Sequence, residues 1–328
     1  MPPELGFAFL GCGAATRRHS ALLRRLSPAV TRFFASRFPP RAREAAEQLG
    51  GAGWFGSYEG ALADPRVHAV VVATPPASHL DLVLAALAAG KHVVVEKPAF
   101  LHSGDFDLVE RAAAAAGRQV LVAENYAYKP IAGLLRSVIG SGELGEIRIA
   151  LLNAMKWQPL EDWRGDPAVA GGGALFEGGI HWVDLLANIG LHIESVQGFR
   201  PGDPEALERT MALVVQYEEG GVGVLLHSWE APSALKGLRL SKITGTRGSI
   251  TFESNGLFAL VRARRTRLWA RPGDIAGYGG MWRDFLAVLR DGHEPQMSLA
   301  RAREAVVVVE SAYESCGVAA AAETSPVY

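Results

Sequence analysis

Residues 7–19, FAFLGCGAATRRH, decide the first half of the fold. An apolar run leads into Gly11 and Gly13, and apolar residues then recur at helical spacing. A strand that turns through Gly-x-Gly into a helix is typical of dinucleotide-binding units. Gly11 allows the tight turn, and Gly13 lets the backbone at Cys12, Ala14 and Ala15 approach a pyrophosphate at the helix N-terminus. Glycines at such a turn can also be purely conformational.

Short β-branched runs alternate with helical stretches through the first part of the chain. Strands are expected at residues 5–10, 30–35, 67–74, 93–96 and 120–124, with helices between them. This spacing predicts βαβ units with right-handed crossovers, and therefore a parallel sheet covered by helices on both faces.

The pattern changes after residue 124. Longer strands of mixed polarity are expected at residues 146–156, 194–199, 209–218, 222–229, 238–244 and 249–253, with helices near 176–189 and 282–290. Hairpin-like turns between several of them favour antiparallel pairing. The fold class is therefore α/β in residues 1–124, with a Rossmann doubly wound parallel sheet. An α+β domain with a large open, mainly antiparallel sheet is expected in residues 125–328.

The composition excludes several classes of partner. The chain has 328 residues, a formal net charge of -1 and 49% hydrophobic residues. It therefore offers no field of one sign for nucleic acid or an anionic membrane. We find no signal peptide and no apolar run of the ~18 residues that a membrane span requires. The two cysteines, Cys12 and Cys316, form no disulfide framework, so a cytoplasmic location is expected. Without paired cysteines or an HExxH motif, no metal is expected.

The end of the second strand bears on the choice of cofactor. A dinucleotide fingerprint expects an acidic residue there to hold the adenine ribose hydroxyls. This chain has Ser36 and Arg37 instead, and Thr16 replaces the third glycine of the fingerprint. A serine and an arginine can bind a 2′-phosphate through charge-assisted hydrogen bonds, so NADP is preferred over NAD. The alternative is an ordinary solvated loop.

A charged pair ends the valine strand at residues 93–95. In a doubly wound sheet, ligands bind at the carboxyl ends of the strands, which is where Lys97 lies. Its ammonium could transfer a proton beside a nicotinamide, and Pro98 prevents the strand from continuing. Alternation along the strand turns Glu96 away from Lys97, so Glu96 is interpreted as structural. The alternative is a surface Glu–Lys pair.

Residues 171–186, GGGALFEGGIHWVDLL, predict a loop that enters a helix. Glu177, His181 and Asp184 can share one helical face, and a histidine beside carboxylates can relay protons near neutral pH. A core histidine or a capping pattern is the alternative. Aromatic and basic residues that could line a substrate pocket are Tyr126, Tyr128, Trp157, Trp163 and Arg164. Core packing of the tyrosines and a surface ion pair of Arg164 are the alternatives.

Four motifs occur together in this order: GCGAATRRH, VVVATPPASHLDLVLAALAAGKHVVVEKP, AENYAYKP and GGGALFEGGIHWVDLL. They closely resemble the glucose–fructose oxidoreductase / inositol dehydrogenase / MocA family, over essentially the whole chain. The resemblance implies an N-terminal Rossmann domain and a C-terminal domain whose open sheet often forms oligomer interfaces. It also implies NAD(P)-dependent oxidation or reduction of sugars, polyols and related carbonyl compounds.

The resemblance also implies roles for single residues. Lys97 matches the lysine that assists proton transfer, and His181 matches the histidine that contacts the substrate hydroxyl or carbonyl. Glu177 stands where the family has an aspartate, and Ser36 where it usually has another. Cofactor contacts are further expected at Thr74, Pro75, His79 and Glu96.

The sequence thus predicts an NADP-dependent oxidoreductase with Lys97 and His181 as catalytic residues. Its partners are expected to be a carbohydrate-like small molecule and further copies of the chain, as a homodimer or homotetramer through the C-terminal sheet. Two alternatives are an NAD-dependent glycoside hydrolase of the same fold and a non-catalytic dinucleotide sensor. The substrate and the direction of hydride transfer are not given by the sequence.

Overall fold

The computed structural model describes residues 5–160, 162–204, 206–232 and 238–318. The chain forms two compact units, residues 1–124 with 278–300 and residues 125–277 with 301–328. The sequence predicts two contiguous domains that meet after Glu124. In the structure, segment 278–300 belongs to the first unit, which is therefore not one contiguous stretch of chain. An amphipathic pattern says that a helix buries one face, but it does not say which core receives that face.

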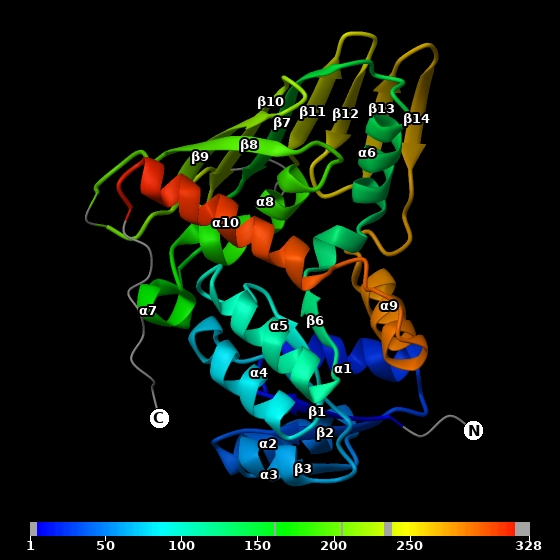
Figure 1. The fold of residues 1–328 in the computed structure, drawn as a ribbon, viewed down its shortest axis with the longest axis vertical. Coiled ribbons are helices and arrows are strands. Elements are labelled where there is room, and N and C mark those ends of the chain that lie inside the picture. The colour runs from blue at the N-terminus through cyan, green and yellow to red at the C-terminus, as the bar shows by residue number, and fades with distance from the viewer. Residues whose placement is uncertain (1–4, 161, 205, 233–237, 319–328) are drawn as a thin grey trace. The chain divides into compact units, whose positions relative to one another are not determined.

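The first unit is built on a six-stranded sheet in the order β3-β2-β1-β4-β5-β6 (Figure 1). All five strand pairs are parallel, which confirms the predicted doubly wound sheet. The strands are β1 (Gly6–Leu10), β2 (Thr31–Ala35), β3 (Gly53–Phe55), β4 (Ala69–Val72), β5 (His92–Glu96) and β6 (Val120–Ala123). The sequence pattern did not predict β3, which has only three residues.

Helices connect these strands and cover both sheet faces. They are α1 (Ala14–Leu26), α2 (Pro39–Leu49), α3 (Tyr58–Ala63), η1 (Pro76–Ser78), α4 (His79–Ala88), α5 (Asp105–Ala116) and the returning α9 (Tyr278–Asp291). Helix α1 packs against α2 and α9, and α4 packs against α5. Because strand order reverses between β1 and β4, right-handed crossovers place these two groups on opposite faces. The carboxyl ends of β1 and β4 therefore form the point where such folds bind ligands.

The second unit is built on an eight-stranded sheet in the order β14-β13-β12-β11-β7-β10-β9-β8 (Figure 1). Only β7 and β10 pair in parallel, so the sheet is mainly antiparallel, as predicted. The strands are β7 (Ile147–Met155), β8 (Ile193–Phe199), β9 (Thr210–Tyr217), β10 (Val222–Ser228), β11 (Leu240–Gly245), β12 (Ser249–Glu253), β13 (Phe258–Arg262) and β14 (Thr266–Ala270). The last two strands extend the sheet beyond the expected set.

One face of this sheet carries the helices of the unit. Helix α8 packs on β7 and β10. The helical segments are η2 (Asn125–Tyr128), α6 (Pro130–Gly140), η3 (Asp162–Gly165), α7 (Pro167–Ala170), the π-helical turn η4 (Leu175–Gly179), α8 (Ile180–Ala187) and α10 (Leu299–Ser315). Among the described residues, no helix is long and apolar enough to cross a bilayer.

Candidate functional site

The two glycines of the first turn have different reasons to be glycine. Gly11 has a φ of 99°, and a Cβ there would lie 2.7 Å from the carbonyl oxygen of Ala73. The fold itself therefore requires glycine at residue 11. Gly13 has an ordinary φ of -86°, and a Cβ there would meet no protein atom within 4 Å. The open space over Gly13, at the N-terminus of α1, is the space that a pyrophosphate needs. The turn therefore fits a dinucleotide.

Side chains that the glycine fingerprint does not specify also bond to the backbone around this turn. The hydroxyl of Thr16, which is fully buried, donates to the carbonyl oxygen of Gly11 at 2.7 Å. The Cys12 thiol lies 3.6 Å from the carbonyl oxygen of Ala35. Burial raises the pKa of this thiol, and the charges of Arg41 and Arg17 oppose the rise. The first turn of α1 also contains Ala14 and Ala15, which lie at its start as expected.

Ser36 and Arg37 follow β2 at the same edge of the sheet. Ser36 is buried, and its Oγ accepts the backbone N–H of Phe38 at 3.1 Å. Arg37 is exposed, and the Arg41 guanidinium lies over the Phe38 ring, 5.3 Å from its centroid. The charges of Arg41 and Arg17 reach the glycine turn, and Arg37 hydrogen bonds to Tyr58. The end of β2 is therefore cationic.

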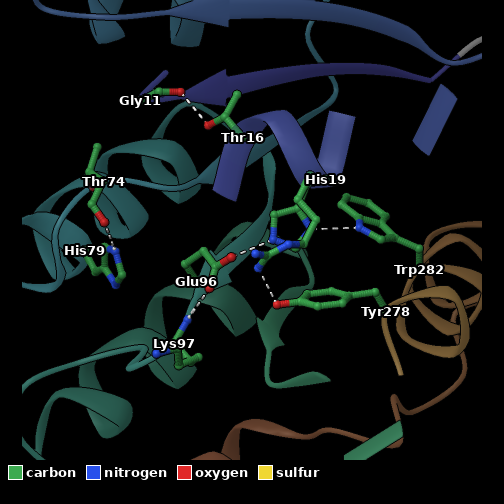
Figure 2. Close-up of polar contacts among 10 residues, drawn as sticks. Gly11, Thr16, His19, Thr74, His79, Glu96, Lys97, Tyr278 and Trp282 are labelled. Carbon is green, nitrogen blue, oxygen red and sulfur yellow. Dashed lines mark hydrogen bonds and ion pairs between the residues drawn. The ribbon is translucent and has the colours of Figure 1, made fainter. Parts of the chain in front are cut away.

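His79 joins the turns that follow β4 and β5 (Figure 2). One ring nitrogen lies 2.9 Å from the carbonyl oxygen of Pro98, and the other lies 2.8 Å from that of Thr74. Burial lowers the pKa of His79, against the favourable effect of these carbonyls on its charged form. Because the side chain has no exposed surface and bonds the carbonyl groups of Thr74, Pro98 and Ala99, His79 holds these two turns together, and its contact with a cofactor stays a prediction.

The carboxylate of Glu96 is held at the end of β5 by two donors. Its Oε1 lies 2.6 Å from Nε2 of His19, and its Oε2 accepts the backbone N–H of Lys97 at 3.1 Å (Figure 2). Burial alone would raise the pKa of Glu96. The hydrogen bond from His19, the charge that His19 carries when it is protonated, and the charge and N–H of Lys97 instead lower it to about 2. Glu96 is therefore a carboxylate at neutral pH. The peptide between Lys97 and Pro98 is cis.

The second unit places His181 in an aromatic cluster. The rings of His181 and Tyr126 are stacked, with centroids 4.3 Å apart and planes at 10°. The ammonium of Lys129 lies 4.0 Å from the Tyr126 centroid, and Trp182 contacts Tyr126 edge-on. Tyr126 and the half-buried Tyr128 both lie in η2. Tyr126 therefore orients the imidazole of His181 through ring contact.

Glu177 is buried in η4, and its Oε1 lies 3.3 Å from Nε of Arg164. The Arg164 guanidinium also lies over the Trp163 ring, 4.7 Å from its centroid. These three residues of the expected pocket are therefore brought together. Trp157 is 62% exposed and forms an isolated antiparallel bridge with Glu230, so it is not part of this group.

The helix expected at residues 176–189 begins as the π-helical turn η4. The carboxylate of Glu208 binds the N–H groups at its start. Glu208 is buried and accepts from the N–H groups of Ala174 at 2.8 Å and Leu175 at 3.0 Å. It also accepts from the hydroxyl of Tyr313 in α10 at 2.5 Å. Burial raises the pKa of Glu208 to about 7 against these three hydrogen bonds. Sequence reasoning missed this carboxylate, because nothing near residue 208 marks it as a cap for residue 174.

The rings of His227 in β10 and Trp229 just after it pack against η4. A Cβ on Gly178 would overlap the Trp229 ring, and one on Gly179 would lie 3.3 Å from the His227 ring. Burial lowers the pKa of His227 to about 3, and the charges of Lys156 and Arg239 act in the same direction. The glycines next to Glu177 are therefore required by packing, a reason that the sequence motif does not reveal.

The comparison with family models assigns both parts of the chain. The model of an oxidoreductase family with an NAD-binding Rossmann fold matches residues 5–124, and that of the GFO/IDH/MocA C-terminal domain matches residues 134–251. The chain belongs to the GFO/IDH/MocA family. The two departures from the family pattern, Ser36 and Glu177, are both buried and hydrogen-bonded or ion-paired here.

Several GFO/IDH/MocA relatives are dehydrogenases by name. Levoglucosan dehydrogenase of Pseudarthrobacter phenanthrenivorans is 29% identical over 166 residues, 48% of this chain and 41% of that protein. D-xylose 1-dehydrogenase (NADP(+)) 2 of Haloferax volcanii is 25% identical over 312 residues, 88% of this chain and 90% of that protein. The chain spans less than two thirds of the length of several curated relatives, with 66%, 41% and 65% covered in three of them.

Among solved structures, GenD2 from gentamicin A biosynthesis, in complex with NAD, is similar over nearly the whole chain. The TM-score is 0.83 at 26% identity, and the match covers 96% of this chain and 94% of that one. The GFO/IDH/MocA fold is therefore present in both units.

Proposed function

We propose that the protein is an NAD(P)-dependent oxidoreductase that acts on a CH–OH or carbonyl group of a sugar, a polyol or a related compound. The observation that carries this proposal is the Glu96–Lys97 turn. It lies on the same carboxyl edge as the open glycine turn, in a chain of the GFO/IDH/MocA family. When bound, the nicotinamide would accept or supply the hydride. The protein's own groups would bind, orient and move a proton.

We assign the proton of the substrate hydroxyl to the Lys97 ammonium and the His181 imidazole. Lys97 is held at its backbone by Glu96, so its side chain starts from a fixed turn. His181 is held by its stack on Tyr126. Side chains fixed in this way suit general acid–base catalysis, which depends on geometry before pKa. Glu177, Arg164 and Trp163 are proposed to contact the substrate.

We propose NADP(H) as the preferred cofactor. Support comes from the cationic end of β2, where Arg37, Arg41 and Arg17 surround the glycine turn, and from Ser36 in place of an acidic residue. Arg37→Ala should weaken NADPH binding at least about tenfold, the usual cost of losing one charge-assisted contact, and leave NADH binding nearly unchanged. Fluorescence titrations of both nucleotides measure this. Equal effects on NADPH and NADH would contradict the preference.

The test of the function itself is direct. The purified protein is examined for bound nucleotide and then assayed with NADP⁺ and NADPH, at the NADPH absorbance band, against a panel of sugars, polyols and ketones. Net reduction or oxidation of nucleotide supports the proposal. Glycoside cleavage without net NADPH change would identify an NAD-dependent hydrolase. Nucleotide binding with no turnover of any compound would leave a sensor.

We further propose that the chain forms a homodimer or homotetramer through the eight-stranded sheet, and that it acts in the cytoplasm. The first proposal rests on apolar side chains that this sheet exposes, such as Leu268 at 73% and Ile149 at 52%. The second rests on Cys12 and Cys316, both of which are unpaired thiols.

A further inference from the structure

Trp282 fixes the protonation pattern of His19, a histidine that the proposed reaction does not use. The indole N–H of Trp282 lies 2.9 Å from Nδ1 of His19, and both side chains are fully buried. An indole nitrogen can only donate a hydrogen bond, so Nδ1 must be the acceptor. The single proton of the neutral imidazole is therefore on Nε2, the nitrogen that faces Glu96 at 2.6 Å (Figure 2). His19 is a donor to Glu96 in this arrangement.

The donor role of His19 bears on Lys97 through one carboxylate. With Oε1 occupied by His19, Glu96 presents Oε2 to the backbone N–H of Lys97 at 3.1 Å. Both oxygens then have a donor, and the carboxylate cannot rotate without losing one of them. An ordered path therefore runs from α9 through α1 to the turn after β5.

We propose that His19, held in its Nε2–H form by Trp282, is a positioning residue that sets the turn of Lys97 through Glu96. This inference rests on the proposed role of Lys97 in the reaction. It gives segment 278–300 a task in the first unit, because α9 supplies the donor that decides which nitrogen of His19 is protonated.

Three groups surround the His19 ring and hold it in place. Tyr278 and Trp282 of α9 contact it edge-on, with centroids 5.8 and 5.6 Å away. The hydroxyl of Tyr278 accepts from the guanidinium of Arg18 at 2.7 Å, so that cation is engaged with the phenol. Glu96 is the anion that faces the ring, and the charge and N–H of Lys97 also stabilise its ionised form.

The decisive pair of variants is His19→Leu and His19→Gln. Glutamine has an amide that can donate to Glu96 and an oxygen that can accept from Trp282, whereas leucine has neither. We expect His19→Leu to lower kcat about tenfold or more, since small misplacements of a reacting group are costly. NADPH affinity should stay within about twofold of wild type, and His19→Gln should restore most of the activity. Val288→Ala, which removes buried apolar atoms of α9 and no side-chain hydrogen bond, is the matched control.

Two measurements do not depend on activity. The amide of Lys97 should exchange its hydrogen slowly in wild type and His19→Gln, and faster in His19→Leu. The ¹⁵N shifts of His19 in wild type should show an unprotonated Nδ1 at neutral pH, and Trp282→Phe should remove the preference for the Nε2–H form. These results hold even if no substrate is turned over, so failure of the proposed function is recognised separately.

Three outcomes would overturn the inference. They are equal loss of activity in the leucine and glutamine variants, unchanged exchange at Lys97 in His19→Leu, and a protonated Nδ1 in wild type at neutral pH. The last needs only the wild-type protein, so it decides the question even if a variant fails to fold.

Discussion

Lys97 combines two groups with different tasks at the end of β5. Its backbone N–H is bound by Glu96, whereas its ammonium is the group that we propose to move a proton. Glu96 and Lys97 therefore work as a unit, although their side chains serve different purposes. Sequence alternation predicts that the two side chains point apart, but it did not indicate that Glu96 would bind the backbone of Lys97.

At this residue, Lys97→Met should lower kcat by about a hundredfold or more, because general acid–base groups typically contribute that much. The affinity for NADPH should stay nearly unchanged, since the methionine keeps the length and the backbone bond of the lysine. Steady-state kinetics and nucleotide titration measure both quantities. Arg111→Met, a change at an exposed arginine of α5, is the control and should leave kcat as it is. Full activity of Lys97→Met would remove this residue from the mechanism.

Glu96 should also stabilise the fold in a pH-dependent way. Its pKa is lowered from 4.5 to about 2 in the folded protein. The stabilisation is therefore complete above about pH 4.5 and is lost as the pH falls through about 2. Glu96→Gln should lower the free energy of unfolding at pH 6.5. The difference in free energy of unfolding between wild type and Glu96→Gln should be smaller by about 1 kcal/mol at pH 3.5 than at pH 6.5. Urea unfolding at the two pH values measures this difference, and a constant difference would contradict the prediction.

At the scale of an element, the segment that carries Glu177 and His181 is fixed at its start by Glu208. The carboxylate spans the N–H groups of Ala174 and Leu175, while the hydroxyl of Tyr313 ties it to α10. A Cβ on Gly173 would overlap Glu208, so this glycine is needed for the approach. The direction of α8 therefore depends on Glu208, a residue that is distant from α8 in the sequence.

The effect of Glu208 on stability should have the opposite sign to that of Glu96. Its pKa is raised from 4.5 to about 7, so the folded state holds a proton that the unfolded state releases. Between about pH 4.5 and 7, this group makes the protein less stable as the pH rises, by up to about 3 kcal/mol. Glu208→Gln should remove that part of the slope in urea unfolding. An unchanged slope between pH 4.5 and 7 would show that Glu208 is already ionised at pH 4.5.

The sequence predicted the elements that end in glycine, proline or a charged residue. It did not predict contacts between residues that are far apart in the chain. Gly11 and Lys97 each lie where an apolar pattern stops, so their places at strand ends could be predicted from the chain. His181 was expected inside a helix at residues 176–189. The roles of Lys97 and His181 stay predictions. His19 and Trp282 are 263 residues apart, and Tyr313 and Glu208 are 105 apart. Such pairs form only when the fold closes, and no local period records them. Strand β3 was too short for any period to mark it.

At the scale of the whole molecule, the helices that the structure describes in the second unit lie on one face of the eight-stranded sheet, and its other face carries none of them. Strand pairing places Leu268, Leu260, Leu151, Val224 and Val214 in one row with Thr251 and Lys242. Along β13 the burial alternates: Ala259 and Val261 are buried, and Phe258, Leu260 and Arg262 are exposed. The row is apolar at both ends, with Thr251 and Lys242 between them. Exposed apolar side chains gathered on one sheet face are typical of a surface that another chain covers.

We therefore expect the protein to be an oligomer, and the double variant Leu260→Lys, Leu268→Lys to be a monomer. The two leucines lie at the apolar end of the row, beyond Thr251 and Lys242. Lysines there would have to be desolvated in an interface, which costs several kcal/mol, whereas in a monomer they stay in water. Light scattering after size exclusion gives the mass of each form. Leu108→Lys, at an exposed leucine of α5 in the other unit, is the control and should keep the wild-type mass. A monomeric wild type, or a double variant with the wild-type mass, would show that this face is not the interface.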